Sequence, residues 1–151
     1  MSQLSYEVNF DKAFEGLLGD VNNIDSVSRI TEGAGILFGR GVQSGTDEEQ
    51  IVAAATGMTL KQFEGFVIHQ PVEKGELVEK YAVSVLRKGR IWVKAEDAIA
   101  KDGDVFLRLA AGEIGVVRSA ADAANTLDIS SKVKVVKGAG AGELALLEIN
   151  I

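Results

Sequence analysis

The sequence contains no cysteine and only one histidine and one proline among its 151 residues. Without cysteine there is no disulfide framework, no thiolate-bound zinc, no iron–sulfur cluster and no thiol nucleophile. A single histidine excludes a metal site built from several imidazoles. Seventeen glycines against one proline indicate turns that depend on positive φ rather than on the fixed φ of proline.

Basic residues are also fewer than acidic ones. There are 16 Lys and Arg against 22 Asp and Glu, so the formal net charge is −6. Non-specific nucleic-acid binding depends on cations that release counterions from phosphates, and we therefore expect no nucleic-acid partner. No apolar run approaches the ~20 residues of a membrane helix, and the N-terminal residues do not have the pattern of a targeting segment, so we expect no membrane partner.

Most of the chain has the pattern of short strands separated by glycines. About eight such segments at intervals of ~8–12 residues favour a mainly β fold, either an antiparallel β-sandwich or a small jelly-roll-like barrel. Ile36–Val42 is expected to be one strand with two internal glycines. Residues 84–94 are expected to be a hairpin that turns at Lys88-Gly89. Strands do not alternate with helices, so a parallel sheet is not expected.

The N-terminal residues differ from the rest in being more polar. We expect an N-terminal arm or short helix at residues 1–30 and a β domain at residues 31–151. Apolar residues near the N-terminus recur at the spacing of an amphipathic helix, namely Phe10, Ala13, Phe14, Leu17 and Leu18. The alternative is an arm that becomes ordered only against a partner.

No segment carries a recognisable catalytic or cofactor-binding motif. His69 has no recognisable nucleophile or orienting carboxylate near it in the sequence, so we interpret it as a structural or interface residue. The glycine-rich segments 33–35 and 138–142 lack the Lys-Ser or Lys-Thr of a phosphate-binding loop and are interpreted as turns. We therefore predict a protein that is not an enzyme and that has no cofactor and no metal.

Clustered carboxylates and one tryptophan leave two other functions open. Acidic residues cluster at 47–49, 96–97 and 102–104, and paired acids can hydrolyse glycosides or bind calcium. A carboxylate-based hydrolase would need such acids to converge in a pocket. A β-sandwich binding module, for carbohydrate or as a virion accessory, would need Trp92 and Tyr81 exposed together on one flat face.

Six segments distributed over nearly the whole chain carry a resemblance to a known family. They are Ser5–Asp20, Ser28–Gly33, Leu37–Val42, Ser84–Val93, Gly103–Leu107 and Gly142–Ile151. In order and spacing these segments resemble the structural cement, or head decoration, proteins of tailed bacteriophages. The similar segments include no catalytic signature, and no functional residue of the family can be transferred from them.

The resemblance implies a β-rich structural protein of the virion, made in the host cytoplasm and located on the outer surface of the capsid. There it would bind across major capsid protein subunits and stabilise the shell. It would act as a homo-oligomer, and a trimer is favoured over a dimer because three-fold positions recur on icosahedral shells. Tyr6, Phe10 and Phe14 are our candidates for the contact with the capsid or with another subunit, since aromatic residues carry much of the energy of interfaces. The alternative is that this segment packs on its own domain.

Overall fold

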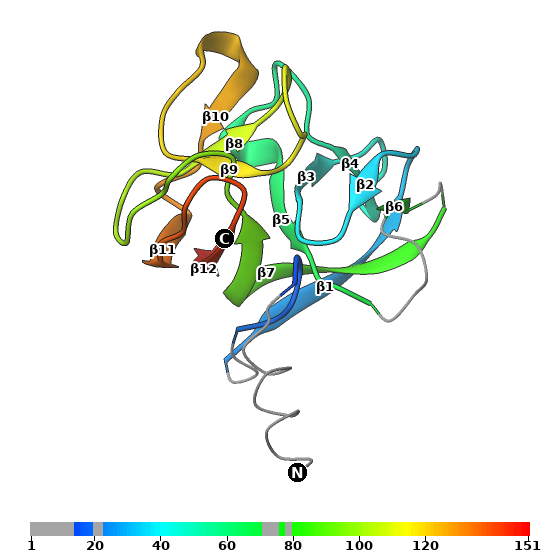
Figure 1. The fold of residues 1–151 in the computed structure, drawn as a ribbon. Coiled ribbons are helices and arrows are strands. Elements are labelled where there is room, and N and C mark those ends of the chain that lie inside the picture. Colours follow the sequence, from blue (N-terminus) through cyan, green and yellow to red (C-terminus); the bar gives the residue numbers. More distant parts are fainter. Residues whose placement is uncertain (1–13, 20–22, 71–75, 78–79) are drawn as a thin grey trace.

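The computed structural model describes residues 14–19, 23–70, 76–77 and 80–151 (Figure 1). These residues confirm the prediction of a mainly β protein. The strands are β1 (Asp25–Thr31), β2 (Ile36–Leu37), β3 (Gly41–Ser44), β4 (Gln50–Ala53), β5 (Phe63–Val67), β6 (Glu76–Leu77), β7 (Ala82–Lys94), β8 (Phe106–Arg108), β9 (Val117–Arg118), β10 (Thr126–Asp128), β11 (Val133–Lys137) and β12 (Leu144–Asn150). Two short 3-10 helices accompany them, η1 (Leu60–Gln62) and η2 (Ala123–Asn125). No helix in the described ranges has the length and apolar character that crossing a membrane requires.

Five of the strands close into a barrel. Their order is β1, β4, β3, β5 and β7, and the barrel closes because β1 pairs with β4 on one side and with β7 on the other. β12 and β11 continue the same sheet beyond β7, and β10, β8 and β9 form a separate small sheet. The sequence left a sandwich and a barrel open, and the closed arrangement is a barrel. β1 and β4 run parallel, which departs from the purely antiparallel sheet that we predicted.

β7 joins the barrel to the outer part of the sheet. Its first half pairs with β1 as far as Lys88, and its second half pairs with β12 from Lys88 onwards. Gly89 lies where the two halves meet and has φ +134°, which allows a strand to bend sharply at a barrel corner. The predicted hairpin at Lys88-Gly89 is therefore wrong, because the chain bends there and continues as one strand.

At Gly39, which has φ +77°, the chain turns where the sequence predicted a continuous strand. The predicted single strand Ile36–Val42 is divided at this glycine: β2 pairs with β6, whereas β3 pairs with β4 and β5. A Cβ at Gly39 would collide with the backbone of Glu15 and Gly16. The glycine is therefore needed both for the turn and for the close approach of the N-terminal segment.

Buried apolar side chains form two clusters, and β7 contributes to both. The smaller cluster comes from barrel strands and β2, and includes Ile36, Val42, Ile51, Val67, Val83 and Val85. The larger cluster lies between the outer part of the sheet and the small sheet, and includes Leu86, Ile91, Val93, Leu107, Ile129 and Leu147. Each fully buried side chain of this size contributes roughly 1.5–3 kcal/mol of transfer free energy, so these clusters provide the main stabilisation of both parts.

Residues 14–19 show no helix, although the sequence predicted one there. The Gly16 N–H donates to the Trp92 carbonyl (2.9 Å) and the Gly19 N–H to the Arg90 carbonyl (2.9 Å). These N–H groups bond to β7 instead of to a preceding helical turn, and the segment contains a single turn in which the Leu17 N–H donates to the Phe14 carbonyl (3.1 Å). Residues 10–13 of the predicted helix lie outside the described residues. β1 begins at Asp25, within the range 1–30 that we assigned to the arm.

Candidate interaction surfaces

We call residues 14–19 the docked segment, because backbone hydrogen bonds hold it on both sides. On one side, the Trp92 N–H donates to the Leu17 carbonyl (2.9 Å). On the other side, the His69 N–H donates to the Gly16 carbonyl (2.9 Å). A Cβ at Gly16 would collide with backbone nitrogens on its neighbours. The docked segment is therefore tightly packed against the β domain, between β7 and the residues that follow β5.

An aromatic cluster marks the start of the docked segment. The Phe14 ring packs edge-on against the His69 ring with centroids 4.5 Å apart, and the Phe38 ring lies 5.0 Å from His69 on centroids. Phe38 is buried, whereas Phe14 is 46% exposed. Of our three candidate contact residues, only Phe14 is described, and Tyr6 and Phe10 lie outside the described residues.

Arg40 connects the docked segment to the body of the protein. It is only 6% exposed, and its Nε lies 2.6 Å from Glu15 Oε1 while its Nη2 lies 3.0 Å from Glu113 Oε2. Lys94 Nζ also binds Glu113 at 2.6 Å. Lys94 chiefly, together with Arg40, lowers the pKa of the Glu113 carboxyl. A buried cation needs such partners to offset its loss of hydration.

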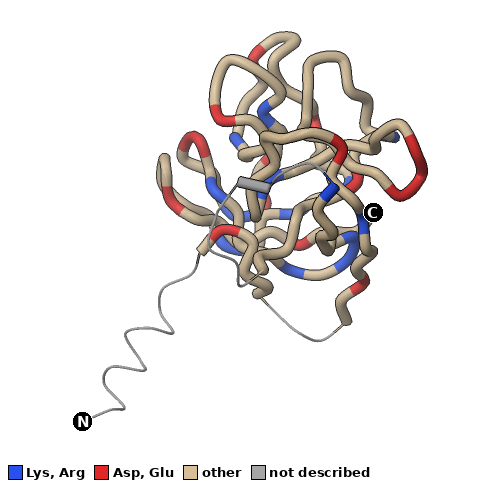
Figure 2. Tube along the Cα trace, turned by 90° about the vertical axis from the view of Figure 1, so that its right-hand side faces the viewer, with Lys and Arg blue, Asp and Glu red and all other residues tan. Residues whose placement is uncertain are grey.

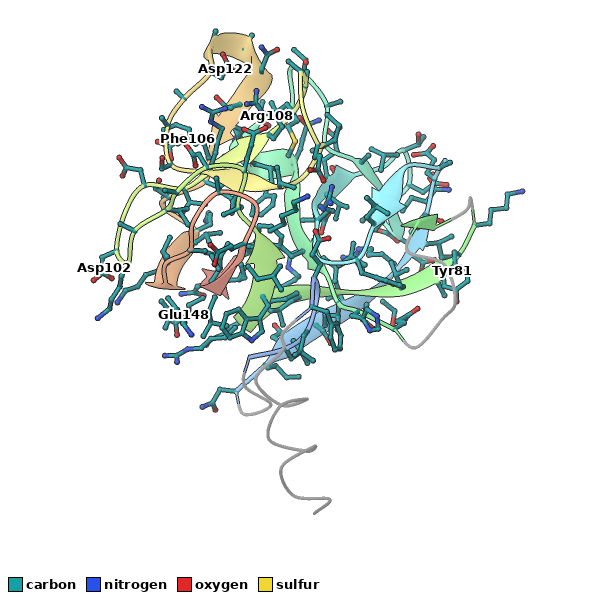
Figure 3. The ribbon with its side chains drawn as sticks, viewed as in Figure 1. Tyr81, Asp102, Phe106, Arg108, Asp122 and Glu148 are labelled. Atoms are coloured by element: carbon teal, nitrogen blue, oxygen red, sulfur yellow. The ribbon has the colours of Figure 1, made fainter. Side chains whose placement is uncertain are left out.

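A second buried cation, Arg108, holds the loops at the end of the small sheet (Figure 3). It is 4% exposed and binds Glu96 at 2.5 Å and Asp122 at 2.6 Å. The hydrogen bonds that Arg108 donates to Glu96 are the main cause that raises the pKa of the Arg108 guanidinium, and Arg108 in turn lowers the pKa of Asp122. We did not predict either buried arginine, since alternation placed Arg108 on the face opposite the buried Leu107.

Of the acidic clusters, residues 96–97 are paired within the fold, whereas residues 47–49 line an open hollow of about 550 Å³ on one exposed loop. Glu96 binds Arg108 and Arg118, and Asp97 accepts hydrogen bonds from the backbone and hydroxyl of Ser119 at 2.8 and 2.9 Å. Among the described residues, three acids have a pKa that departs from the ordinary value, namely Glu32, Glu113 and Asp122, and in each the pKa is lowered. A lowered pKa favours the carboxylate rather than the protonated acid that a hydrolase needs. No group of acids or histidine in the described ranges has the arrangement of a metal site.

Trp92 and Tyr81 do not share one flat face. Tyr81 precedes the first residue of β7 and Trp92 lies near its other end, and a strand rises ~3.3 Å per residue. Trp92 is half-buried, and the Lys137 ammonium lies 5.6 Å from the centroid of its ring. The arrangement that a carbohydrate-binding module required is therefore not formed by these two residues.

The outer part of the sheet carries an open groove with a volume of about 530 Å³. Strand residues of β7, β11 and β12 line it together with Asn23 and the loop before β11. We call it the basic groove, because its charged lining residues are Lys88, Arg90, Lys132, Lys134 and Glu148. In a chain whose net charge is −6, this is a local excess of positive charge.

Comparison with known families identifies a family that covers nearly the whole chain. The family model described as "Structural cement protein (E217 gp24/Pam3 gp6)" matches residues 2–150. The chain belongs to the structural cement protein family. The resemblance found in the sequence is thereby confirmed, and this cement protein is a structural component of the phage virion rather than a member of an enzyme family.

Two solved structures are similar to this cement protein to different degrees. A chain in the structure entitled "The capsid of Myoviridae Phage XM1" superposes with a TM-score of 0.71 at 17% identity, covering 91% of this chain and 90% of that chain. The structure entitled "The crystal structure of head fiber gp8.5 N base in bacteriophage phi29" gives a TM-score of 0.49 at 16% identity, covering 84% of this chain and 94% of that chain. No curated protein matches the sequence. At 17% identity the first likeness shows a common fold.

Proposed function

We propose that this protein binds the outer surface of the phage head, bridges neighbouring major capsid protein subunits and stabilises the shell. The observation that carries the proposal is the family match over residues 2–150. The geometry supports it, because charged groups of the described residues form ion pairs within the fold, while others line an open groove and an exposed acidic loop at the surface. Such a surface is suited to binding another protein.

The docked segment supports a role for the N-terminal residues in that contact. Phe14 is 46% exposed, while Glu15 and Gly16 directly after it are bound to the β domain. The residues before Phe14, which include Tyr6 and Phe10, therefore start from a fixed point on the domain. Fixing one end of a binding segment reduces the ordering cost of the complex, and aromatic side chains supply large contact areas at low entropy cost.

A homo-oligomer, with a trimer favoured, would strengthen this binding. Each subunit that touches the shell raises the effective concentration of the others near their own sites. Several weak contacts per subunit then give tight attachment without any single high-affinity site. A trimer also matches the three-fold symmetry that recurs on an icosahedral shell.

Co-sedimentation with expanded, undecorated heads of the parent phage tests the proposal, with unexpanded proheads as the comparison. We expect saturable binding to expanded heads and none to proheads. Phe14→Ala and a deletion of residues 2–13 should each weaken binding, and Ile24→Ala, which removes another exposed apolar side chain, should not. Absence of binding to both kinds of particle contradicts the proposed function.

A further inference from the structure

The basic groove holds cations that the fold leaves largely free to bind another charged group. Arg90 lies 3.9 Å from Glu148 and Lys134 lies 3.6 Å from Asp102, both long distances for ion pairs between exposed side chains. Lys88 forms no ion pair with any residue in the described ranges. Ion pairs of this kind contribute ~1 kcal/mol or less, so an incoming carboxylate can replace them at little cost.

The face around the basic groove also offers apolar surface. Trp92 pairs with Leu146 across β7 and β12, next to the pair of Arg90 and Glu148. Both Trp92 and Leu146 are half-buried. A cationic groove beside exposed apolar atoms is suited to an acidic protein segment that has an apolar neighbour, because burial of the apolar parts adds to the charge attraction.

A segment with those properties lies on the same chain, in the loop between β3 and β4. We call Thr46–Glu49 the acidic tip, since Asp47, Glu48 and Glu49 follow one another and are all exposed. Ile30, which is 38% exposed, lies beside it and donates its N–H to the Glu49 carbonyl (2.8 Å). The acidic tip thus combines three carboxylates with an apolar neighbour.

The acidic tip is held in one conformation by its own hydrogen bonds. Glu32 accepts hydrogen bonds from the Thr46 N–H (2.8 Å) and hydroxyl (2.6 Å), and these bonds lower the pKa of the Glu32 carboxyl. The Gln50 N–H donates to the Asp47 carbonyl (3.0 Å), and the Asp47 N–H donates to the Gln50 side chain (3.1 Å). A preorganised loop loses little conformational entropy when it binds.

The basic groove and the acidic tip cannot meet within one molecule. β11 and β12, which line the groove, lie on one side of the molecule, and β3 and β4, which carry the tip, lie on the other (Figure 1). Figure 2 shows several Asp and Glu positions on outer loops of the trace and several Lys and Arg positions nearer its middle. The occupant that these features favour is a second copy of the chain.

We propose that the acidic tip of one copy binds in the basic groove of the next copy, and that this contact assembles the homo-oligomer. The inference rests on the proposed function in that it names the subunit contact of the proposed oligomer. A single tip-in-groove contact between neighbours is heterologous and generates a ring when its rotation closes, whereas two reciprocal contacts between the same two copies give a two-fold dimer. Because the contact is largely electrostatic, salt weakens it.

Charge reversal tests the contact in solution, without phage heads. The variants are Lys88→Glu/Lys134→Glu in the groove, Glu48→Lys/Glu49→Lys in the tip, and the combination of all four changes. Lys61→Glu/Lys80→Glu makes the same change of charge at two exposed residues outside the groove and is the matched control. Mass is measured by light scattering and sedimentation equilibrium at low and high salt, and circular dichroism confirms that each variant is folded.

We expect the unmodified chain and the control to be oligomers at low salt. Each double reversal should raise the dissociation constant at least tenfold, and the combined variant should recover association because its charges are again complementary. A monomeric unmodified chain, or unchanged mass in both reversals, overturns the inference. Weakening by the groove reversal alone would mean that a part of the second copy other than the acidic tip contacts the groove, and this overturns the inference as well. Head co-sedimentation of the same variants is scored separately, so failure of head binding remains distinguishable from failure of the subunit contact.

Discussion

Replacement of Arg40 by methionine should release the docked segment while the β domain stays folded. Arg40 is 6% exposed and binds Glu15 and Glu113. Methionine fills much of the same space without the charge. Hydrogen bonds to charged groups contribute ~1.5–3 kcal/mol each. The Glu15 and Glu113 side chains are 31% and 53% exposed, so water recovers part of that loss. We therefore expect the free energy of unfolding to fall by about 2 kcal/mol.

A double-mutant cycle isolates the pair that holds the segment. Glu15→Gln keeps the shape of the side chain and removes its charge, and the cycle with Arg40→Met should give a coupling energy of ~1–2 kcal/mol in urea unfolding. Glu113→Gln is the comparison. Glu113 is 53% exposed, and we expect its coupling with Arg40 to stay below ~1 kcal/mol.

Hydrogen exchange measures the effect of Arg40→Met on the docked segment itself. The Gly16 and Gly19 N–H groups donate to carbonyls of β7, so their protection should fall in Arg40→Met more than protection of amides in the core of β7. The reasoning is refuted if the protection of these two glycines is unchanged, or if the Glu15 coupling is zero while Arg40→Met still destabilises the protein. Either result would mean that backbone hydrogen bonds and packing hold the docked segment without a contribution from the ion pair.

Three further variants test other parts of the structure. Gly65→Ala should lower the free energy of unfolding by more than ~1 kcal/mol in a urea titration, because an added methyl at φ +131° would collide with a β7 carbonyl. Gly57→Ala is the comparison, since Gly57 has φ +91° but lies in open space, and it should lower the free energy of unfolding by less. Leu107→Ala, at a fully buried site, should cost ~2–5 kcal/mol in urea unfolding. Arg108 lowers the pKa of Asp122, so their pair stabilises the fold above the usual carboxyl pKa of ~3.9, and the benefit is lost as pH falls through the lower folded value. Asp122→Asn should therefore be less stable than the unmodified protein at pH ~7, and the difference in urea unfolding should shrink as the pH is lowered below ~3.9.

The sequence predicted the elements that depend on local pattern. Alternation in residues 105–109 correctly separated the buried Val105, Leu107 and Leu109 from Phe106. The glycine-rich segment at residues 138–142, interpreted as a turn, likewise connects β11 to β12. In these places neighbouring residues decide the conformation, so the amino-acid pattern is sufficient.

The predictions at two glycines, Gly39 and Gly89, were wrong in opposite directions. Gly39 was expected to lie inside a strand and ends one, whereas Gly89 was expected to turn the chain and lies within β7. Both have positive φ, so their local preference is the same. Whether the chain turns or only bends depends on the strands that pair on either side, and those partners lie far away in the sequence.

The candidate sites depend even more on distant contacts. Arg40 and Arg108 are charged residues whose burial follows from acids up to 73 residues away, and a single sequence carries no pattern for such pairs. The closure of the barrel by β1 and the parallel pairing of β1 with β4 are likewise set by the packed fold. The expectation that no catalytic motif is present came from residue types alone, and it agrees with the structural family to which the chain belongs.

The shared strand β7 has a consequence for the order in which the chain can fold. β1, β3, β4 and β5 all precede it, yet the barrel closes only when β1 and β5 both pair with β7. During synthesis from the N-terminus, these earlier strands would leave edges unpaired until residues 82–88 have left the ribosome. The outer strands β12 and β11 then assemble on the second half of the same strand. The strands of both halves of the molecule therefore complete their pairing only after β7 has been synthesised. We expect the formation of these long-range strand pairs to limit the folding rate.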